Sequence, residues 1–330
     1  MSTHGQIPAN TPDSARMLAA LELAPVTDQP GADGGPTVCT ARTQYVPWPK
    51  AYGGDLVAQG VRAMQSSFEP AHQGPGKVLH SMHSYFMRPG DIGAEIRYEV
   101  EHLRDGRGYS TRQVRAYQNG KIIYTGLGSF AVPAEGPEYF PAAEDAVDGE
   151  IPAPEEVPST AEALVSEGVL SSAGPGAEAL PEVTESLHRA ADYWAHGRSF
   201  DIRHVPGPVY VAADESRTPR QAIWLKTFGR LPSDDPALHQ AALAYVCDYT
   251  ILEPSLRAVG MHWRAEGFVS ASLDHSMWFH RPARVDDWLL YVSESLNVSG
   301  QRGLSGGKFY TRDGILVASL AQEGMIRMPS

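Results

Sequence analysis

Apolar and polar residues alternate along several segments of the chain, and this two-residue period is typical of β-strands with one buried face. Two such regions contain a short turn sequence. In "STRQVRAYQNGKIIYTGLGSF" the turn is Asn119-Gly120, and in "LSGGKFYTRDGILVASLAQEG" it is Asp313-Gly314. Asn-Gly and Asp-Gly favour the tight turns of β-hairpins. The pattern therefore predicts one antiparallel hairpin in each half of the chain.

Two segments with a helical period precede these strands. In "YGGDLVAQGVRAMQSSF" the period places Val57, Val61 and Met64 close to one face. The segment "SDDPALHQAALAYVCDYTILEPSL" begins with Asp235, a good cap, followed by Pro236, a favoured first-turn residue. It is apolar nearly all round, so we expect it to be buried. Each half is thus predicted to be α+β, with one buried helix followed by a long antiparallel sheet.

The two halves also resemble each other in sequence at a constant offset of 193 residues. When residues 82–103 are set against residues 275–296 without gaps, six of 22 positions agree, among them Phe86 with Phe279. The same offset relates Asp248 to Asp55. The repeat therefore predicts an aspartate at the same place in both buried helices.

The segment between the two halves differs from them in composition. Pro and Gly cluster there, and thirteen acidic residues without any Lys or Arg lie between Ala134 and Ser186. This segment carries most of the net charge of −12, so nucleic acid is not an expected partner. We expect a solvated linker with a short helix near "STAEALVSEGVL". The predicted division is a disordered tail over 1–15, domains over 16–133 and 198–330, and a linker over 134–197.

Targeting signals are not evident in the sequence. The first residues contain no apolar run of the signal-peptide type, and the final "RMPS" is not a peroxisomal S-K-L address. No window approaches the roughly 20 apolar residues of a membrane span. Cys39 and Cys247 provide no disulfide framework, which fits a reducing compartment. We therefore expect a cytoplasmic protein without a membrane span.

Asp248 is the first candidate for chemistry. It lies in "ALAYVCDYTIL", where its neighbours are almost all apolar or aromatic. An ionised carboxylate in such surroundings is costly unless it is paired, hydrogen-bonded or neutralised. The sequence leaves two interpretations open: Asp248 belongs to a solvated polar face, or it is a catalytic carboxylate whose pKa is raised toward working pH.

Six motifs resemble those of the acyl-CoA thioesterase II family. They are "YGGDLVAQG" (52–60), "HSMHSYFMRPGD" (80–91), "YQNGKIIY" (117–124), "LDHSMWFHRP" (273–282), "FYTRDGILVAS" (309–319) and "QEGMIR" (322–327). The resemblance spans both halves and leaves out the acidic linker. It implies a double hotdog, two tandem domains in each of which a long helix is wrapped by an antiparallel sheet.

The resemblance also implies a reaction, the hydrolysis of fatty acyl-CoA thioesters to free fatty acid and CoA, without a cofactor or a metal ion. Members use an Asp, a Thr or Ser, and a Gln to position the attacking water, and the motifs place these at Asp248, Ser272 and Gln322. Many relatives have Thr where this chain has Ser272. Leu79 and Gly128 occupy the hydroxyl and amide positions of the first half, which should be catalytically silent. A homodimer or a dimer of double hotdogs is expected.

Five other residues are expected to contact the acyl-CoA substrate. Gly54 and Asp55 lie in "YGGD", where glycine could let CoA approach closely, although a plain tight turn fits equally well. His80 borders the strand predicted to face the pocket. Trp278 lines an acyl tunnel unless it is simply a core residue. Arg107 belongs to a group of arginines that could meet the anionic CoA.

Two other functions remain open from the sequence. Hotdog enoyl-CoA hydratases or dehydratases carry an Asp with a His five residues later, whereas Glu253 and Gly60 stand at those positions here. A non-catalytic acyl-CoA-binding module is the second alternative.

Two further motifs could be mistaken for a nucleophile. "GLSGG" around Ser305 matches the nucleophile elbow G-x-S-x-G, but that motif needs a strand-to-helix turn and a later histidine. The last histidine, His280, lies upstream of Ser305, and the residues after Ser305 are predicted to form a hairpin. Cys247 is expected to be a small core residue rather than a reactive thiol.

Overall fold

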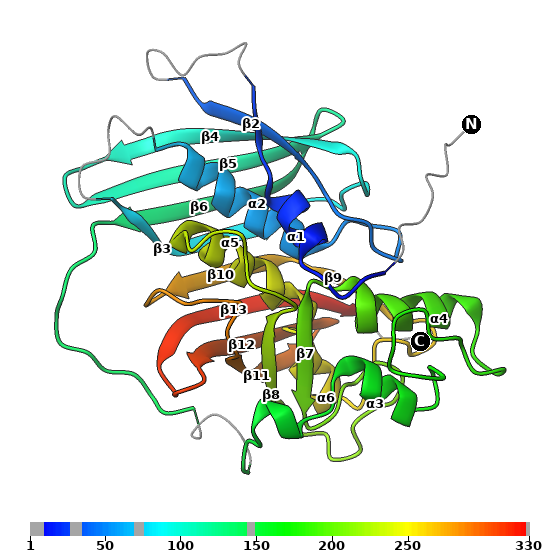
Figure 1. Cartoon of the computed structure of the whole chain (residues 1–330). Coiled ribbons are helices and arrows are strands. Elements are labelled where there is room, and N and C mark those ends of the chain that lie inside the picture. Colours follow the sequence, from blue (N-terminus) through cyan, green and yellow to red (C-terminus); the bar gives the residue numbers. More distant parts are fainter. Residues whose placement is uncertain (1–9, 27–34, 69–75, 144–148, 328–330) are drawn as a thin grey trace.

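The computed structural model describes residues 10–26, 35–68, 76–143 and 149–327, whose strands form one antiparallel sheet (Figure 1). The first half contributes β1 (Ala24–Pro25), β2 (Thr37–Arg42), β3 (Val78–Phe86), β4 (Glu95–Asp105), β5 (Tyr109–Gln118) and β6 (Lys121–Ala131). The second half contributes β7 (Phe200–Val205), β8 (Arg220–Thr227), β9 (Val269–Ser272), β10 (Asp274–Phe279), β11 (Leu289–Ser299), β12 (Arg302–Thr311) and β13 (Leu316–Arg327). The strand order is β1-β2-β4-β5-β6-β3-β10-β13-β12-β11-β8-β7, and β9 pairs with β13.

The helices lie on the inner side of this sheet and over its end at β7 (Figure 1). They are α1 (Ala15–Leu21), α2 (Gly53–Ser66), α3 (Thr160–Ser166), α4 (Glu185–Asp192), α5 (Pro236–Val246) and α6 (Glu253–Ala258). Shorter turns are the 3₁₀ helices η3 (Pro154–Glu156) and η5 (Cys247–Tyr249) and the π-helical turn η4 (Tyr193–Gly197). Within the described residues, no helix has the length and apolar character needed to cross a membrane.

The sequence repeat is a two-fold relation between two hotdog domains. The order β2-β4-β5-β6-β3 in the first half matches β8-β11-β12-β13-β10 in the second, and the domains join where β3 pairs with β10. At the centre of that pairing His83 lies opposite Ser276, and its Nδ1 is 3.0 Å from the serine Oγ. These two residues are 193 positions apart, so the pseudo-two-fold axis passes between them. The predicted double hotdog is confirmed.

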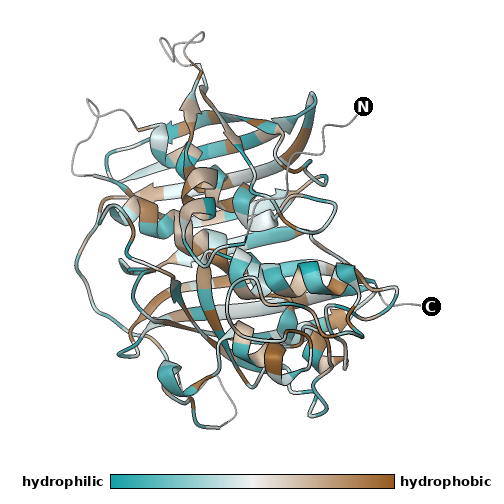
Figure 2. Ribbon diagram, turned by 45° about the vertical axis from the view of Figure 1, so that its right-hand side comes forward, coloured by the Kyte–Doolittle hydropathy of each residue, from teal (hydrophilic) through white to brown (hydrophobic). Residues whose placement is uncertain are grey.

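Both predicted hairpins are present. Asn119 and Gly120 link β5 to β6 with φ angles of 51° and 70°, the left-handed backbone that a two-residue turn requires. Gly314 has φ 82° in the looser turn between β12 and β13. Along the strands, hydrophilic and hydrophobic residues alternate (Figure 2). The inner face of the sheet packs on the helices. The outer face carries most of the exposed polar residues, except in the second domain, where Trp224, Leu290 and Tyr310 are buried in a second apolar cluster.

The second buried helix is not continuous, which corrects the sequence prediction. It is divided into α5, η5 and α6. In an unbroken helix the ring of Pro254 would clash with the carbonyl of Thr250. Instead the chain turns there, and Glu253 N donates to Thr250 O at 3.0 Å. The 193-residue offset relates α2 to residues 246–259, so η5 and α6 are its counterpart, and α5 is an added helix that packs beside α2.

The expectation of a solvated linker is wrong, although the predicted short helix is present as α3. In the first part of the linker, Ala143 and Val157 are buried in an apolar cluster with Trp224, and the second part is packed as well. Leu164, Leu170, Ala191 and Tyr193 are buried in the same apolar core as the helices of both domains. Within the predicted N-terminal tail, residues 1–9 lie outside the described residues. Asn10 is not free, because its Nδ2 donates to Asp192 Oδ2 at 2.7 Å.

Candidate active site

Asp248 lies in η5, at the break between α5 and α6. This turn is the N-terminal side of the helix wrapped by the second domain, just as Asp55 lies in the first turn of α2. Asp248 is half-buried, while the residues on either side of it, Cys247 and Tyr249, are buried. Its carboxylate is therefore held among apolar groups and still reaches the inner face of the sheet.

Three side chains from separate elements meet at this carboxylate. Ser272 Oγ donates to Asp248 Oδ1 at 2.8 Å, and Gln322 Nε2 donates to the same oxygen at 2.6 Å. The amide nitrogen of Gln322 is also 3.0 Å from Ser272 Oγ. The three residues proposed from the sequence motifs therefore form one compact hydrogen-bonded group that joins η5, β9 and β13.

An irregularity in the sheet brings Ser272 to this group. Ser272 pairs with Gly324 and Ser276 with Ala321, so the register between β13 and its neighbours slips by one residue at Leu273. Such a bulge changes which side chains face inward. In a regular strand, residues an odd number of positions apart face opposite sides. Because of the slip, Ser272 and His275 both point to the helix side. Gln322 lies between them on β13.

The surroundings of Asp248 act on its pKa in opposing directions. Burial raises the pKa above the usual range for aspartate, and this is the largest effect. The hydrogen bonds from Gln322 and Ser272 lower the pKa by smaller amounts, as do the electrostatic interactions with His275 and Lys50. Burial dominates, so the carboxylate is a stronger base than an exposed aspartate.

The first domain supplies the opposite wall of the site. A Cβ atom on Gly53 would lie 2.5 Å from Asp248 Oδ2 and 3.1 Å from the ring of Phe86, so only glycine fits at the start of α2. Lys50, in the loop before α2, donates from Nζ to the carbonyl oxygen of Ser270 in β9. The site thus lies between the two domains. Sequence reasoning missed Gly53, Phe86 and Lys50, and only the neighbouring "YGGD" pointed toward them.

The equivalent position in the first domain is filled by apolar packing. A Cβ on Gly128 would lie 2.7 Å from Met64 Sδ and 3.1 Å from Leu79 Cδ1. Asp55 is fully buried and accepts hydrogen bonds from Gln44, at 2.9 Å from the backbone N and at 3.3 Å from Nε2. Among the described residues it has an amide partner in Gln44 but no hydroxyl partner corresponding to Ser272.

The remaining expected substrate contacts are dispersed. Gly54 lies beside Tyr245 and the ring of Tyr52, where a Cβ would overlap both. His80 bonds Ser129 Oγ at 2.8 Å, and Trp278 is 38% exposed between buried neighbours; both are on the outer face of the sheet. Arg107 is exposed in the turn between β4 and β5. The structure brings none of these last three to the Asp248 group.

The two motifs that resembled nucleophiles are structural. Ser305 is buried in β12 and shares a hydrogen bond of 3.0 Å with Ser255 Oγ. Cys247 Sγ donates to Ala244 O at 3.0 Å, and burial raises its pKa well above the ordinary value for a thiol. A thiolate, the reactive form, is therefore disfavoured there.

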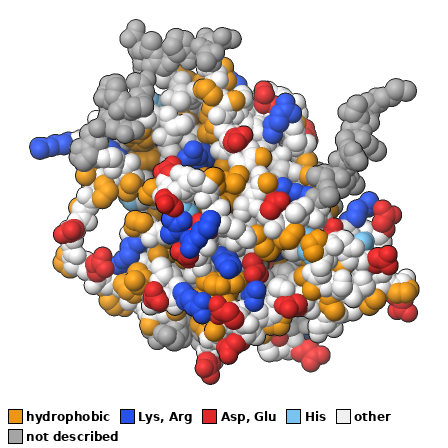
Figure 3. Space-filling view, viewed as in Figure 1, with side chains coloured by type: hydrophobic (Ala, Val, Ile, Leu, Met, Phe, Trp, Pro, Cys, Tyr) orange, Lys and Arg blue, Asp and Glu red, His pale blue; other side chains and the backbone are white. Residues whose placement is uncertain are grey.

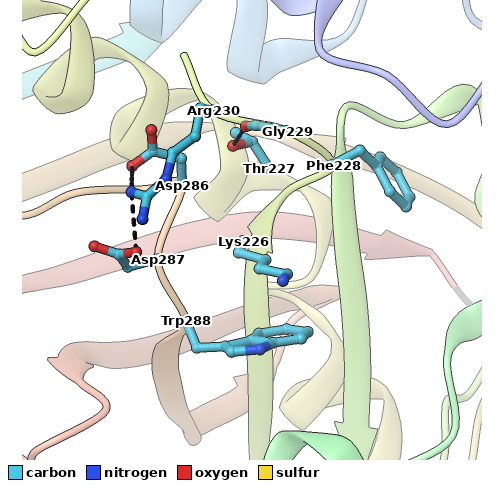
Figure 4. Close-up of a pocket in the computed structure, with 8 residues that line it drawn as sticks. All are labelled: Lys226, Thr227, Phe228, Gly229, Arg230, Asp286, Asp287 and Trp288. Atoms are coloured by element: carbon cyan, nitrogen blue, oxygen red, sulfur yellow. Dashed lines mark hydrogen bonds and ion pairs between the residues drawn. The ribbon is translucent and has the colours of Figure 1, made fainter.

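A surface pocket of about 270 Å³ lies elsewhere, at the end of β8 (Figure 4). In it Arg230 forms ion pairs with Asp286 at 3.3 Å and Asp287 at 3.0 Å. None of the Asp248 group lines this pocket. Basic and acidic side chains are interspersed over the face shown in Figure 3, so that face offers no broad patch of one sign.

The fold and the site define a class, the double hotdog proteins that bear one polar cluster between their domains. The model of the acyl-CoA thioesterase family matches residues 200–325, and that of the acyl-CoA thioesterase N-terminal domain matches residues 45–131. The chain belongs to the acyl-CoA thioesterase II family and is a thioester hydrolase.

Individual proteins support this assignment over most of the chain. It is 33% identical over 288 residues to human acyl-coenzyme A thioesterase 8, covering 87% of this chain and 83% of that one. It is 34% identical over 282 residues to acyl-CoA thioesterase 2 of Haemophilus influenzae, covering 84% and 88%. A solved structure, the tesB protein MAP1729c of Mycobacterium avium subs paratuberculosis, is 28% identical with a TM-score of 0.68, covering 96% and 100%.

Proposed function

We propose that this thioesterase hydrolyses fatty acyl-CoA to free fatty acid and CoA with a water molecule that Asp248, Ser272 and Gln322 position and activate. One observation carries the proposal: Ser272 and Gln322 both converge on Oδ1 of a half-buried carboxylate whose pKa is raised by burial. A base with a pKa nearer to working pH is the better proton acceptor.

The reaction proceeds without a covalent enzyme intermediate. Asp248 takes a proton from the water, and the water oxygen attacks the carbonyl carbon of the thioester. The resulting tetrahedral intermediate then breaks the carbon–sulfur bond. The sulfur leaves as a thiolate and receives the proton that Asp248 acquired, which restores the carboxylate. Ser272 and Gln322 hold the water in line, and such positioning lowers the entropic part of the barrier.

The N-terminus of α2 is the proposed site of oxyanion stabilisation. The helix begins at Gly53, beside Asp248, and its N-cap residue Tyr52 makes no capping hydrogen bond with its side chain. The first N–H groups of a helix lack partners within the helix, so they are available to a developing negative charge. The base would then come from the second domain and the oxyanion donors from the first.

The two alternative functions make different predictions. A hydratase needs a second acid or base five residues after the aspartate, but Glu253 is buried against His204, at 3.0 Å, and Trp263, also at 3.0 Å. Crotonyl-CoA should therefore not lose its conjugated thioester absorbance without release of the CoA thiol, which is the result that a hydratase would give. A binding module would hold palmitoyl-CoA without releasing thiol, whereas the hydrolase releases one CoA thiol per turnover.

The decisive variant is Asp248→Asn. The amide is nearly isosteric but cannot accept the proton, so kcat for palmitoyl-CoA should fall by about 10²- to 10⁴-fold with a small change in KM. Thiol release measured with a chromogenic disulfide follows the rate. Asp55→Asn is the matched control, because it makes the same change at the equivalent position of the other domain. Wild-type turnover by Asp248→Asn would exclude this base.

Assembly and location are proposed on narrower grounds. We propose a homodimer formed through the outer face of the sheet, where Tyr85 is 59% exposed and Trp278 38% exposed. Light scattering after gel filtration should give a mass of two chains, and the Tyr85→Asp variant should give the mass of one chain.

We also propose a cytoplasmic location, supported by two unpaired, buried thiols, Cys39 and Cys247. Cell fractionation tests it.

A further inference from the structure

A buried histidine contacts the polar cluster from the side opposite Asp248. His275 Nδ1 lies 2.8 Å from Gln322 Oε1, and both residues have no exposed surface. The two lie on adjacent strands, β10 and β13, and both point toward the helices. His275 does not contact Asp248 or Ser272 through any hydrogen bond in the described structure. Apart from the electrostatic interaction between the His275 ring and the Asp248 carboxylate, an effect on the reaction must therefore pass through Gln322.

The Gln322 amide is useful in only one of its two orientations. Its Nε2 donates to Asp248 and lies within 3.0 Å of Ser272 Oγ. If the amide turned by 180°, Oε1 would face the carboxylate oxygen, and an acceptor would meet an acceptor. The site therefore needs something that holds Oε1 away from Asp248.

The contact with His275 determines which ring nitrogen carries the proton. An amide oxygen is only an acceptor, so His275 must donate from Nδ1. Its Nε2 is then the unprotonated nitrogen, and it faces the Sγ of Cys247 at 3.6 Å. The single S–H of Cys247 is donated to Ala244 O, so this sulfur contact does not require a proton on Nε2. Burial also lowers the pKa of His275, which favours the neutral ring.

The repeat provides an internal comparison. Subtracting 193 from 275 gives 82, and Met82 is a fully buried apolar residue on β3. The offset between β13 and β6 is 194, because Ser276 pairs with Ala321 where His83 pairs with Leu127, so in the first domain the position of Gln322 is occupied by Gly128 and there is no amide to orient. The histidine is present in the domain that has the glutamine and absent from the domain that lacks it.

We propose that His275 is a positioning residue, which works as the neutral Nδ1–H tautomer and holds the Gln322 amide with its nitrogen toward Asp248 and Ser272. This inference rests on the proposed function, because it assigns Gln322 to the positioning of water. It predicts that loss of the Nδ1–H donor lowers kcat while substrate binding is retained.

Two variants of His275 separate hydrogen bonding from packing. His275→Leu keeps an apolar volume but has no donor, and kcat should fall by about 10- to 100-fold with KM changed less than about threefold. His275→Asn places an N–H near the position of Nδ1, and kcat should stay within about threefold of wild type. Equal losses in both variants would overturn the proposal.

A double-variant cycle distinguishes failure of the inference about His275 from failure of the proposed function. If His275 acts through Gln322, His275→Leu should cause no further loss of kcat in a Gln322→Ala background. Additive losses would mean a packing role and would overturn the inference. Full activity in both Gln322→Ala and Asp248→Asn would instead refute the proposed function.

A spectroscopic test reads the tautomer in the wild-type protein and needs a variant only to assign the signal. Nitrogen-15 NMR of histidine-labelled protein reports which ring nitrogen is protonated. His275 should give the signature of the Nδ1–H tautomer throughout the pH range of activity. An Nε2–H tautomer, or a charged ring at the pH of maximal activity, would overturn the assignment. The signal is identified by its loss in His275→Asn.

Discussion

Two aspartates at equivalent positions of the repeat have different partners. Asp248 is half-buried and accepts hydrogen bonds from a hydroxyl and an amide, whereas Asp55 is fully buried and bonds only to Gln44 among the hydrogen bonds of the described residues. Burial raises the pKa of both. The residue type is the same, so the partners decide which one is available to chemistry.

The pH dependence of catalysis should report the pKa of Asp248. The base must be ionised to take a proton, so kcat/KM should fall as the pH drops through that pKa. Because the pKa is raised, the midpoint should lie above about 4, the value for a free aspartate. Rates with palmitoyl-CoA across the acid range measure it. A midpoint below 4 would contradict a desolvated base.

Asp55 should make folding stability depend on pH. Burial raises its pKa to about 7, so the folded state binds a proton that the unfolded state releases at lower pH. Its contribution is present below about pH 4 and is lost as the pH rises to about 7, a change on the order of a few kcal/mol. Urea unfolding should show the wild type losing stability relative to Asp55→Asn over this interval. A constant difference would contradict the assignment.

At the scale of the elements, the site depends on two interruptions of regular structure. Pro254 lies in the first turn of α6 and prevents a continuous helix from η5, so Asp248 is held in a separate turn before α6. The bulge at Leu273 turns Ser272 inward beside Gln322. A continuous helix and a regular strand would carry the same residues to separate places.

The start of α2 should not tolerate a side chain at Gly53. Alanine is the better helix former by about 1 kcal/mol, so propensity alone predicts that Gly53→Ala stabilises the protein. The new Cβ would instead displace the Asp248 carboxylate, and kcat should fall by at least about tenfold while the melting temperature drops. Gly108→Ala, which adds a Cβ in open space, is the control and should retain activity. Unchanged kinetics in Gly53→Ala would contradict the close approach.

At the scale of the whole molecule, the two domains form one packed unit. A single apolar core contains residues of both domains and of the segment between them. Tyr52 Oη in the first domain donates to Tyr245 O in the second at 2.6 Å, across an offset of 193 residues. The Asp248 group lies near this junction, so the proposed mechanism draws on both domains although only one carries the proposed base.

Removal of the hydrogen bond from Tyr52 to Tyr245 should destabilise both domains together. Tyr52→Phe should lower the free energy of unfolding by about 1 kcal/mol, the usual net value of a buried hydrogen bond. Unfolding in urea should remain one transition, since both domains share a core. Tyr139→Phe makes the same change at a side chain that is 90% exposed and should have no effect. Two separate transitions would show that the domains unfold independently.

Much of this arrangement could be predicted from local patterns. The hairpins at Asn119-Gly120 and Asp313-Gly314 follow from turn chemistry, and the domain duplication follows from the 193-residue offset. Lys50 and Gly53 could not be predicted, because their partners are about 200 residues away in the chain. The packing of residues 160–197 was also missed, since charge and Pro/Gly content say little about the few apolar residues that become buried.

The sequence by itself determined the duplicated α+β architecture, because periodicity, turn residues and repeat offset are local properties of the chain, whereas Ser272 and Gln322 were proposed only from motifs that resemble the family. Only the tertiary structure decided that Asp248 faces the first turn of α2 and that His275 lies behind Gln322. Those contacts depend on a one-residue slip in the sheet and on close packing between the domains, and neither has a local signature in the sequence.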